Sequence, residues 1–505
     1  MTETPTVRQI ERRSIDFVPE DERHGRVSHQ GPFWFLSNFH FFAIAIGFVG
    51  PSLGLSLGAT VLGGTLGTLI GTAFQAFHAS QGPELGLPQM IQSRAQFGFR
   101  GVIVPLLGVL VSLLGYNVVA AVLIANGAKS LWGIDRNVLI TTIVACTALV
   151  AIYGHDWLHL VFRTLFWLST PLFLGLSAAI LLRPAGWAGT APAASLGFAW
   201  PAFLTQLAAA ASFNITAAPY VSDYSRYLPK STPRLVIVAH VFAGAAASAI
   251  WLIVLGAWLA TQLGASDALV ALHQAGDHLI FGLGSILVAV SICALCANVA
   301  MNDYSSMLTF VTMMDCFRSV SPTRRLRAVV VIALSFGWAA LAFTMGGNAI
   351  AYVNDSLVIM LYFLTPWTAV NLIDFFILRR GRYVIGDIFT PHGRYGAWGV
   401  RGLLAYAVGF AASAPFFVIP GLYVGPAAAR IGGGDIGWVV GLAASSAAYL
   451  LATQLTRFAG LGGDGHDGLS LFEPTASPHR LPSGAAADPS ISGPLTPGVE
   501  RSDAH

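Results

Sequence analysis

Polar side chains that could bind a small molecule lie inside otherwise apolar stretches of this sequence. An asparagine amide carries both an acceptor and donors, which is what the edge of a heterocycle requires. Aromatic rings could stack on the two faces of such a ligand, and a carboxylate at membrane depth could carry a proton. The residues of these kinds are Asn38, His40, Tyr116, Asn117, Phe213, Asn214, Asn298, Asn302 and Asp303.

Each of these side chains has a structural alternative. Helices in a bilayer use asparagine amides to hydrogen bond to one another, and for a single asparagine this role and ligand contact are both open. For Asn298 and Asn302, one helical turn apart, we favour ligand contact. Asp303 could instead face cytoplasmic water at a helix end. Asp355 and Asp374 are weaker candidates for coupling, because a solvated position suits them better.

The composition identifies the environment of these residues. Of 505 residues, 55% are apolar and only 10% are charged, which excludes an ordinary soluble globular protein. One crossing of the hydrocarbon core takes roughly 20 apolar residues. We therefore predict an all-α integral membrane protein with about twelve transmembrane helices, near residues 33–57, 60–80, 101–125, 137–155, 158–183, 198–220, 233–262, 279–316, 327–347, 350–379, 400–424 and 436–458.

Two predicted spans contain helix breakers. The first is interrupted at Gly47–Gly54, which includes Ser52, and the sixth carries Asn214, Thr216 and Pro219 near its end. Within a bilayer, a backbone can leave helical geometry only where it faces a cavity that satisfies its freed groups. Interrupted spans at corresponding places in two halves are typical of secondary transporters. We therefore predict a binding site between these two breaks, near the membrane midplane.

The basic residues predict the orientation. If the N-terminus is cytoplasmic, all but four of the 27 Lys and Arg residues fall in cytoplasmic segments. An excess of Lys and Arg in cytoplasmic loops is what sets the orientation of a membrane protein. A missed crossing would move every later loop to the opposite side and remove this excess. Both termini are therefore predicted to be cytoplasmic. The four exceptions are Lys129, Arg136, Arg183 and Arg430.

The chain has one predicted folded unit. Residues 1–32 form a cytoplasmic N-terminal segment, 33–459 the transmembrane transport domain, and 460–505, rich in Gly, Ser, Pro and Asp, a disordered cytoplasmic tail. The cytoplasmic segments show no hydrolytic triad, nucleotide-binding glycine loop or metal-ligand spacing. We therefore expect neither an enzyme nor a bound cofactor or metal.

Several segments resemble one transporter family. Gly86–Gly101, Gly115–Asn117 and Ala218–Pro229, with Ile10–Arg13 and Pro19–Gly25 before them, are similar to the purine and cytosine permease branch of the nucleobase:cation symporter-1 family. The resemblance implies a leucine-transporter-like fold with a five-plus-five inverted repeat and two extra helices. It places the substrate between the first, third, sixth and eighth spans. By motif position, Tyr116, Asn117, Phe213, Asn214, Asn298 and Asn302 would contact it.

The sequence departs from the family pattern at two places. Many relatives have a tryptophan where this chain has Ala217, so Phe213 is the expected stacking partner. Sodium-coupled relatives supply two adjacent hydroxyls in the eighth span, where Cys296 and Ala297 stand here. A thiol and a methyl are poor ligands for a hard cation. We therefore predict proton coupling, with sodium as the alternative.

The predicted function is import of a nucleobase, cytosine or a purine, by alternating access across the cell (inner) membrane. Its partners would be the base, a proton or sodium and the lipid bilayer, and not nucleic acid. The alternatives are a carrier of another heterocycle, such as allantoin, a hydantoin or a vitamin precursor, and a ligand-binding receptor or channel. The predicted substrate-binding residues are Ser52, Tyr116, Asn117, Phe213, Asn214, Asn298 and Asn302, and the predicted coupling residues are Asp303 and His40.

Overall fold

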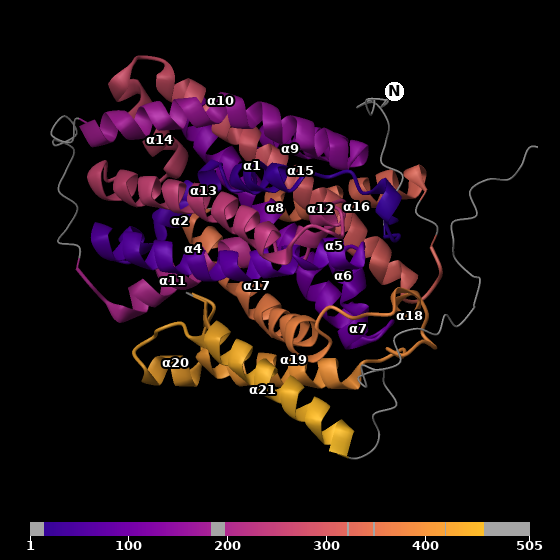
Figure 1. Cartoon of the computed structure of the whole chain (residues 1–505). Coiled ribbons are helices and arrows are strands. Elements are labelled where there is room, and N and C mark those ends of the chain that lie inside the picture. Colours follow the sequence, from indigo (N-terminus) through magenta and orange to yellow (C-terminus); the bar gives the residue numbers. More distant parts are fainter. Residues whose placement is uncertain (1–14, 183–196, 321–322, 347–348, 420, 459–505) are drawn as a thin grey trace, which may run out of the picture. The chain divides into compact units, whose positions relative to one another are not determined.

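The computed structural model describes residues 15–182, 197–320, 323–346, 349–419 and 421–458. These residues are mostly helical (Figure 1). Their one sheet is a short antiparallel pair, β1 (Val418–Ile419) and β2 (Tyr423–Val424). The predicted tail, 460–505, and residues 1–14 of the N-terminal segment lie outside the described residues.

Long apolar helices follow the predicted spans. Among the described residues, nine helices are long and apolar enough to cross a membrane, or ten if a bent pair of helices at the start of the chain counts as one span. The other two predicted spans contain shorter helices. In chain order, the helices in the twelve predicted spans are α1 (Gln30–Ser37) with α2 (Phe41–Gly47) and α3 (Val49–Ser52), α4 (Leu57–Ala79), α8 (Ile103–Trp132), α9 (Arg136–Tyr153), α10 (His155–Leu182), α11 (Trp200–Ile215) with α12 (Val221–Ser225), α13 (Arg234–Gln262), α15 (Leu283–Asp315), α16 (Arg324–Thr344), α17 (Ala349–Leu372), α19 (Val400–Ser413) and α21 (Gly437–Phe458).

Short helical elements connect the spans. The α14 helix begins where Asp267 accepts hydrogen bonds from the backbone N–H groups of Leu269 and Val270. The short elements are η1 (Glu20–Glu22), η2 (Val27–His29), α5 (Gln81–Leu85), α6 (Gln89–Gln92), α7 (Arg94–Phe97), α14 (Ala268–Leu279), η4 (Ile373–Leu378), α18 (Ile385–Ile388), η5 (Ala414–Phe416) and α20 (Pro426–Arg430).

The first, second, sixth and seventh spans pack into a tight bundle, formed by α1, α2, α4, α11 and α13. Glycine allows this approach. A Cβ at Gly256 of α13 would lie 2.0 Å from the carbonyl oxygen of Ile44, and one at Gly71 of α4 would lie 2.1 Å from that of Ala211. Small residues at helix contacts let membrane helices approach each other closely and gain van der Waals packing. These four spans therefore form one packed unit.

The third, fourth, eighth and ninth spans form a second packed group, in which α15 lies against α8, α9 and α16. The predicted eighth span, 279–316, is a single uninterrupted helix, α15, of 33 residues. At 1.5 Å per residue it is about 50 Å long, which exceeds the roughly 30 Å hydrocarbon core. It can therefore reach from the membrane midplane well beyond the apolar layer.

The break in the first span lies elsewhere than predicted. The α1 helix ends at Ser37, α2 begins at Phe41, and the chain bends by 59° between them. The predicted breaker segment, Gly47–Gly54, instead spans the short end helix α3. Pro51 is tolerated there because the N–H groups of a first helical turn have no intrahelical partner. The prediction was therefore wrong about the main bend, although a smaller interruption at Phe48, between α2 and α3, falls within the predicted segment.

The break in the sixth span is confirmed. The α11 helix ends at Ile215, residues 216–220 form turns, and α12 resumes at Val221. Pro219 cannot donate a helical hydrogen bond. The sequence signal and the structure therefore agree within a few residues.

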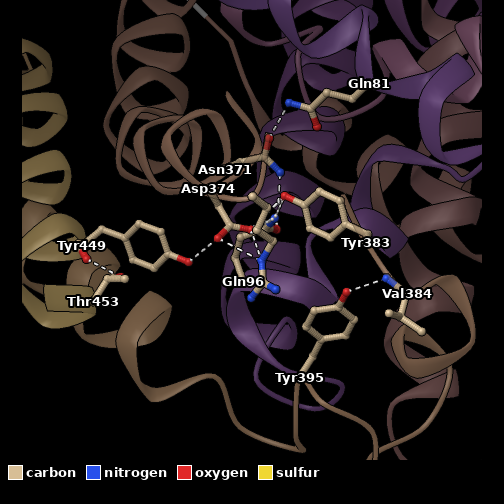
Figure 2. Close-up of polar contacts among 10 residues, drawn as sticks. Gln81, Gln96, Asn371, Asp374, Tyr383, Val384, Tyr395, Tyr449 and Thr453 are labelled. Carbon is tan, nitrogen blue, oxygen red and sulfur yellow. Dashed lines mark hydrogen bonds and ion pairs between the residues drawn. The ribbon is translucent and has the colours of Figure 1, made fainter. Parts of the chain in front are cut away.

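Asp374 is not solvated, contrary to the expectation from sequence. It lies in the π-helical turn η4 at the end of the tenth span and is fully buried. Its carboxylate accepts hydrogen bonds from Gln96 Nε2 at 2.8 Å, Tyr383 OH at 2.8 Å and Tyr449 OH at 2.9 Å, and it pairs with Arg379 Nε at 3.0 Å (Figure 2). Because Tyr449 comes from α21, this carboxylate ties the last span to the tenth.

Candidate functional site

The break in the first span exposes a backbone carbonyl that polar side chains satisfy. The Ser37 carbonyl accepts from Asn298 Nδ2 at 2.7 Å and lies 3.0 Å from His40 Nε2. A carbonyl can only accept, so this bond needs the His40 hydrogen on Nε2. Asn298 and His40 are both buried. Their contacts in the structure hold the break, and Asn298 does not line the cavity described below.

Asn214 also joins helices. Its Oδ1 accepts from Asn38 Nδ2 at 2.7 Å, and its Nδ2 donates to Thr72 Oγ1 at 2.5 Å. Asn38 donates further to the carbonyl of Ala245 at 3.1 Å. Asn214 is fully buried. Of the two roles open to it from sequence, the structure shows interhelical hydrogen bonding between the first, second, sixth and seventh spans.

A narrow cavity lies where the break in the sixth span meets α8 and α15. Its volume is about 10 Å³, roughly the room that one water molecule needs. Two predicted residues, Tyr116 and Asn302, line it. Asn302 Oδ1 is buried and has no hydrogen-bond partner among the described residues. The other lining residues are Ser112, Leu113, Thr216 and Tyr220.

Thr216 and Tyr220 were not predicted from the sequence to belong to the site. Both flank Pro219 in the break of the sixth span. Backbone that leaves helical geometry inside a membrane must line a cavity or be buried in protein. Proximity to the predicted break was therefore a signal that could have found them.

Phe42 lies where the sequence suggested a bound ring. Tyr116 and Phe213 were expected to sandwich a planar ligand, but the Phe42 ring stacks on both. Its centroid is 4.4 Å from that of Tyr116 and 6.0 Å from that of Phe213, with interplanar angles of 20° and 9°. There is therefore no open space for a ligand between the Tyr116 and Phe213 rings. A planar ligand between them would have to replace the ring of Phe42.

Asp303 is buried one layer behind the cavity, with only 1% of its surface exposed. Its Oδ1 accepts from Asn117 Nδ2 and Trp338 Nε1, both at 2.9 Å, and its Oδ2 accepts from Thr147 Oγ1 at 3.1 Å. This burial excludes the alternative of a helix end in water. All three donors are neutral, so no cation in direct contact fixes the charge of this carboxylate.

Asn117 connects this carboxylate to the cavity. It is fully buried, and its Oδ1 accepts from Asn302 Nδ2 at 3.2 Å. Asn117 thus lies behind Asn302, which itself faces the cavity.

Ser52 is not part of this arrangement. It is exposed at the end of α3, and its hydroxyl donates to the carbonyl of Val49 at 2.7 Å. Because the first span breaks near residues 38–40, a segment of helix separates Ser52 from the break. We therefore leave Ser52 out of the site that we propose below.

Two broken spans, a tight bundle, a second helix group and a polar cavity at one break define a secondary transporter. Solved structures share the fold. Mhp1, a nucleobase-cation-symport-1 family transporter in a closed conformation with bromovinylhydantoin bound, matches with a TM-score of 0.69 at 16% identity, over 89% of this chain and 97% of that one. A Na⁺-coupled sialic acid symporter matches with a TM-score of 0.59 at 13% identity, over 86% and 91%. The chain therefore has the predicted leucine-transporter-like inverted-repeat fold.

Sequence comparison identifies the family. Residues 17–441 match the family described as permeases for cytosine/purines, uracil, thiamine and allantoin. YxlA of Bacillus subtilis, named as a purine-cytosine permease, is 33% identical over 457 residues, which cover 90% of this chain and 98% of that protein. The purine-cytosine permease fcyB of Emericella nidulans is 26% identical over 466 residues, covering 87% and 88%. The chain belongs to this permease family, so the predicted family is confirmed and the protein is an integral membrane transporter, not an enzyme.

Proposed function

We propose that this permease imports a nucleobase, cytosine or a purine, across the cell (inner) membrane by alternating access, together with a proton. The observation that carries the proposal is the cavity at the break of the sixth span, where the Tyr116 ring and the unpartnered Oδ1 of Asn302 meet. Relatives named as purine-cytosine permeases support the substrate class. The distribution of Lys and Arg supports cytoplasmic termini.

The cavity residues suit the edge of a base. Asn302 Oδ1 can accept from a ring N–H or an exocyclic amino group, and the hydroxyls of Thr216 and Tyr220 can donate or accept. Tyr116 and Phe213 would stack on the ring once Phe42 moves aside. Asn117, Asn214 and Asn298 would not contact the base directly, but would hold the helices around it in place.

Asp303 is the proposed proton carrier. Its neutral surroundings leave its charge free to change, and the Thr147 hydroxyl can donate to the carboxylate or accept from the protonated acid. His40 is a second candidate, because its buried Nδ1 has no partner among the described residues. Cys296 and Ala297, at the positions where sodium-coupled relatives supply hydroxyls, argue against sodium.

Uptake measurements test the proposal. Proteoliposomes with an imposed proton gradient should accumulate a radiolabelled base, and collapse of the gradient should stop accumulation. If cytosine, adenine, guanine and hypoxanthine fail to compete while allantoin, a hydantoin or a vitamin precursor does, the substrate class is wrong. If uptake only equilibrates, the protein is a channel or receptor. If uptake at fixed pH follows sodium and ignores the proton gradient, the coupling ion is wrong.

Asn302→Ala should weaken base binding. A lost buried hydrogen bond costs about 1–3 kcal/mol, which corresponds to a roughly 5- to 150-fold higher Kd. Equilibrium binding to purified protein measures this change. Asn298→Ala is the matched control, since it removes the same side chain one turn away; it should lower thermal stability more than affinity, because its amide bonds to Ser37. An unchanged Kd for Asn302→Ala would make Asn302 only an interhelical contact.

Phe42→Leu should strengthen base binding. The ring of Phe42 competes with the ligand for the faces of Tyr116 and Phe213, and a stacked pair contributes about 0.5–1.5 kcal/mol. Removal of the stacking should therefore lower Kd by roughly two- to tenfold. Phe41→Leu, at the neighbouring fully buried position, controls for loss of core packing. Weaker binding in Phe42→Leu would show that Phe42 is itself a wall of the site.

A further inference from the structure

We infer that Asn117 is the positioning residue through which the charge state of Asp303 acts on Asn302 in the cavity. The inference rests on the proposed proton coupling and deepens it. Within the described chain, Asn117 is the side chain that hydrogen bonds to both residues. It thus bridges the buried carboxylate and the cavity lining.

The geometry uses both ends of one amide. Asn117 Nδ2 donates to Asp303 Oδ1 at 2.9 Å, while Asn117 Oδ1 accepts from Asn302 Nδ2 at 3.2 Å. Asn302 Oδ1, at the other end of its own amide, has no partner among the described residues. All three side chains are at least nine-tenths buried. Water therefore does not screen the interactions along this chain of bonds.

The charge of Asp303 changes the strength of this chain. A hydrogen bond to an ionised group is roughly twice as strong as a neutral one, and linked hydrogen bonds polarise one another in a low-dielectric interior. Ionised Asp303 therefore strengthens the hydrogen bond that it accepts from Asn117 Nδ2. The polarised Asn117 amide in turn strengthens the bond that its Oδ1 accepts from Asn302 Nδ2. When Asp303 takes up a proton, both bonds weaken, and Asn302 Nδ2 becomes free to donate to an acceptor on the substrate, beside the Oδ1 that already faces the cavity. Proton and substrate binding then favour each other, as symport requires.

Asp303 can take up a proton without breaking the hydrogen bonds of Asn117. Asp303 Oδ1 already accepts from two donors, so the proton goes to Oδ2, which lies 3.1 Å from Thr147 Oγ1. Thr147 then accepts from Asp303 and donates to the carbonyl of Val144 at 3.4 Å. The proton comes from water on the side to which the site is open, and it leaves with the substrate.

The described titratable side chains around α15 do not contact Asp303. None of those on the elements packed against α15 hydrogen bonds to it or pairs with it. They are His40 beside α2, Tyr116 and Lys129 on α8, Arg136, Cys146 and Tyr153 on α9, Arg163 on α10, His273, Asp277 and His278 on α14, Arg324, Arg325 and Arg327 on α16, and Cys293, Cys296, Tyr304 and Asp315 on α15 itself.

Proton uptake on substrate binding tests the inference. Full-length protein in weakly buffered detergent solution, with a pH indicator, is mixed with whichever of cytosine, adenine, guanine or hypoxanthine binds most tightly. The wild type should take up protons on binding, and its affinity should rise at least about fivefold from pH 8 to pH 5, the lower range of measured couplings. Asp303→Asn should lose both effects. Asn117→Ala should also lose both, although Asp303 is present, and its affinity should vary less than about twofold with pH.

Trp338→Phe is the matched control. It removes another donor to Asp303 Oδ1 without touching the bridge to Asn302 or the proposed proton position on Oδ2, so proton uptake should persist. Asn117→Ser, which is too short to reach both partners, decides by the same criteria if Asn117→Ala is poorly folded. Uptake that persists in Asn117→Ala, or is lost in Trp338→Phe, overturns the role of Asn117 and leaves the proposed proton carrier standing. No uptake in the wild type, or uptake in Asp303→Asn, overturns coupling through Asp303 itself.

Discussion

Asp303→Asn should abolish accumulation of the base against its gradient. Asparagine has nearly the same shape and can still accept from Asn117 and Trp338, but it cannot carry a proton. The variant should still exchange internal for external base, because exchange needs no net proton movement. In proteoliposomes with an imposed pH gradient, the ratio of internal to external base should fall to about one, the value set by equilibration alone.

A second carboxylate, that of Asp355, provides a matched control for this experiment. Asp355, in the first part of α17, is half-buried rather than fully buried, and it is not among the contacts of the cavity or of Asp303. Asp355→Asn should therefore keep concentrative uptake. If Asp303→Asn still accumulates base under the same gradient, another group carries the proton, and His40 is the next to test.

Asp374→Ala should destabilise the fold strongly. This carboxylate is fully buried and holds Arg379, Gln96, Tyr383 and Tyr449 together, and the Arg379 side chain is only 8% exposed (Figure 2). Breaking a buried ion pair by removing one partner costs about 3–5 kcal/mol, because it leaves the other charge buried and unpaired. The melting temperature of the purified protein in detergent should fall accordingly, and the yield of monodisperse protein should fall with it.

An exposed ion pair serves as the comparison. Arg394 Nε lies 3.2 Å from Asp387 Oδ2, with side chains 41% and 24% exposed. Pairs of this kind contribute only about 0–1 kcal/mol, so Asp387→Ala should barely change the melting temperature. Asp374→Asn should fall between the two, since it keeps an acceptor but loses the charge. Equal melting temperatures for Asp374→Ala and Asp387→Ala would contradict a central role for Asp374.

Hydropathy and charge in the sequence were enough to predict the membrane spans and the fold class. Each crossing is a local property, because roughly 20 consecutive apolar residues must match the bilayer. The break of the sixth span was also predictable, since Pro219 disrupts a helix wherever it packs. The family motifs added the inverted-repeat topology, and Asp303 stood out because a carboxylate inside an apolar span is costly unless it is used.

The tertiary structure alone decided which polar residues face the cavity and which hold helices together. Asn214, Asn298 and Asn302 look alike in sequence, but Asn214 bonds to Asn38, Asn298 to the Ser37 carbonyl, and Asn302 lines the cavity. These partners lie in spans far apart along the chain. An amide in a membrane bonds to whichever neighbour packing places beside it.

The same reason explains the remaining errors. The main bend of the first span lies at residues 38–40 rather than at Gly50 and Pro51, because contacts with other spans hold it there. Asn298 of the eighth span donates to the freed Ser37 carbonyl, and the Asn38 side chain donates to Asn214 of the sixth span and to the Ala245 carbonyl of the seventh. Phe42 fills the space between Tyr116 and Phe213, and Asp374 is buried because α21 packs over it. Hydropathy along the chain determined where helices form. Contacts between distant helices determined the pairing, burial and orientation of their polar and aromatic side chains.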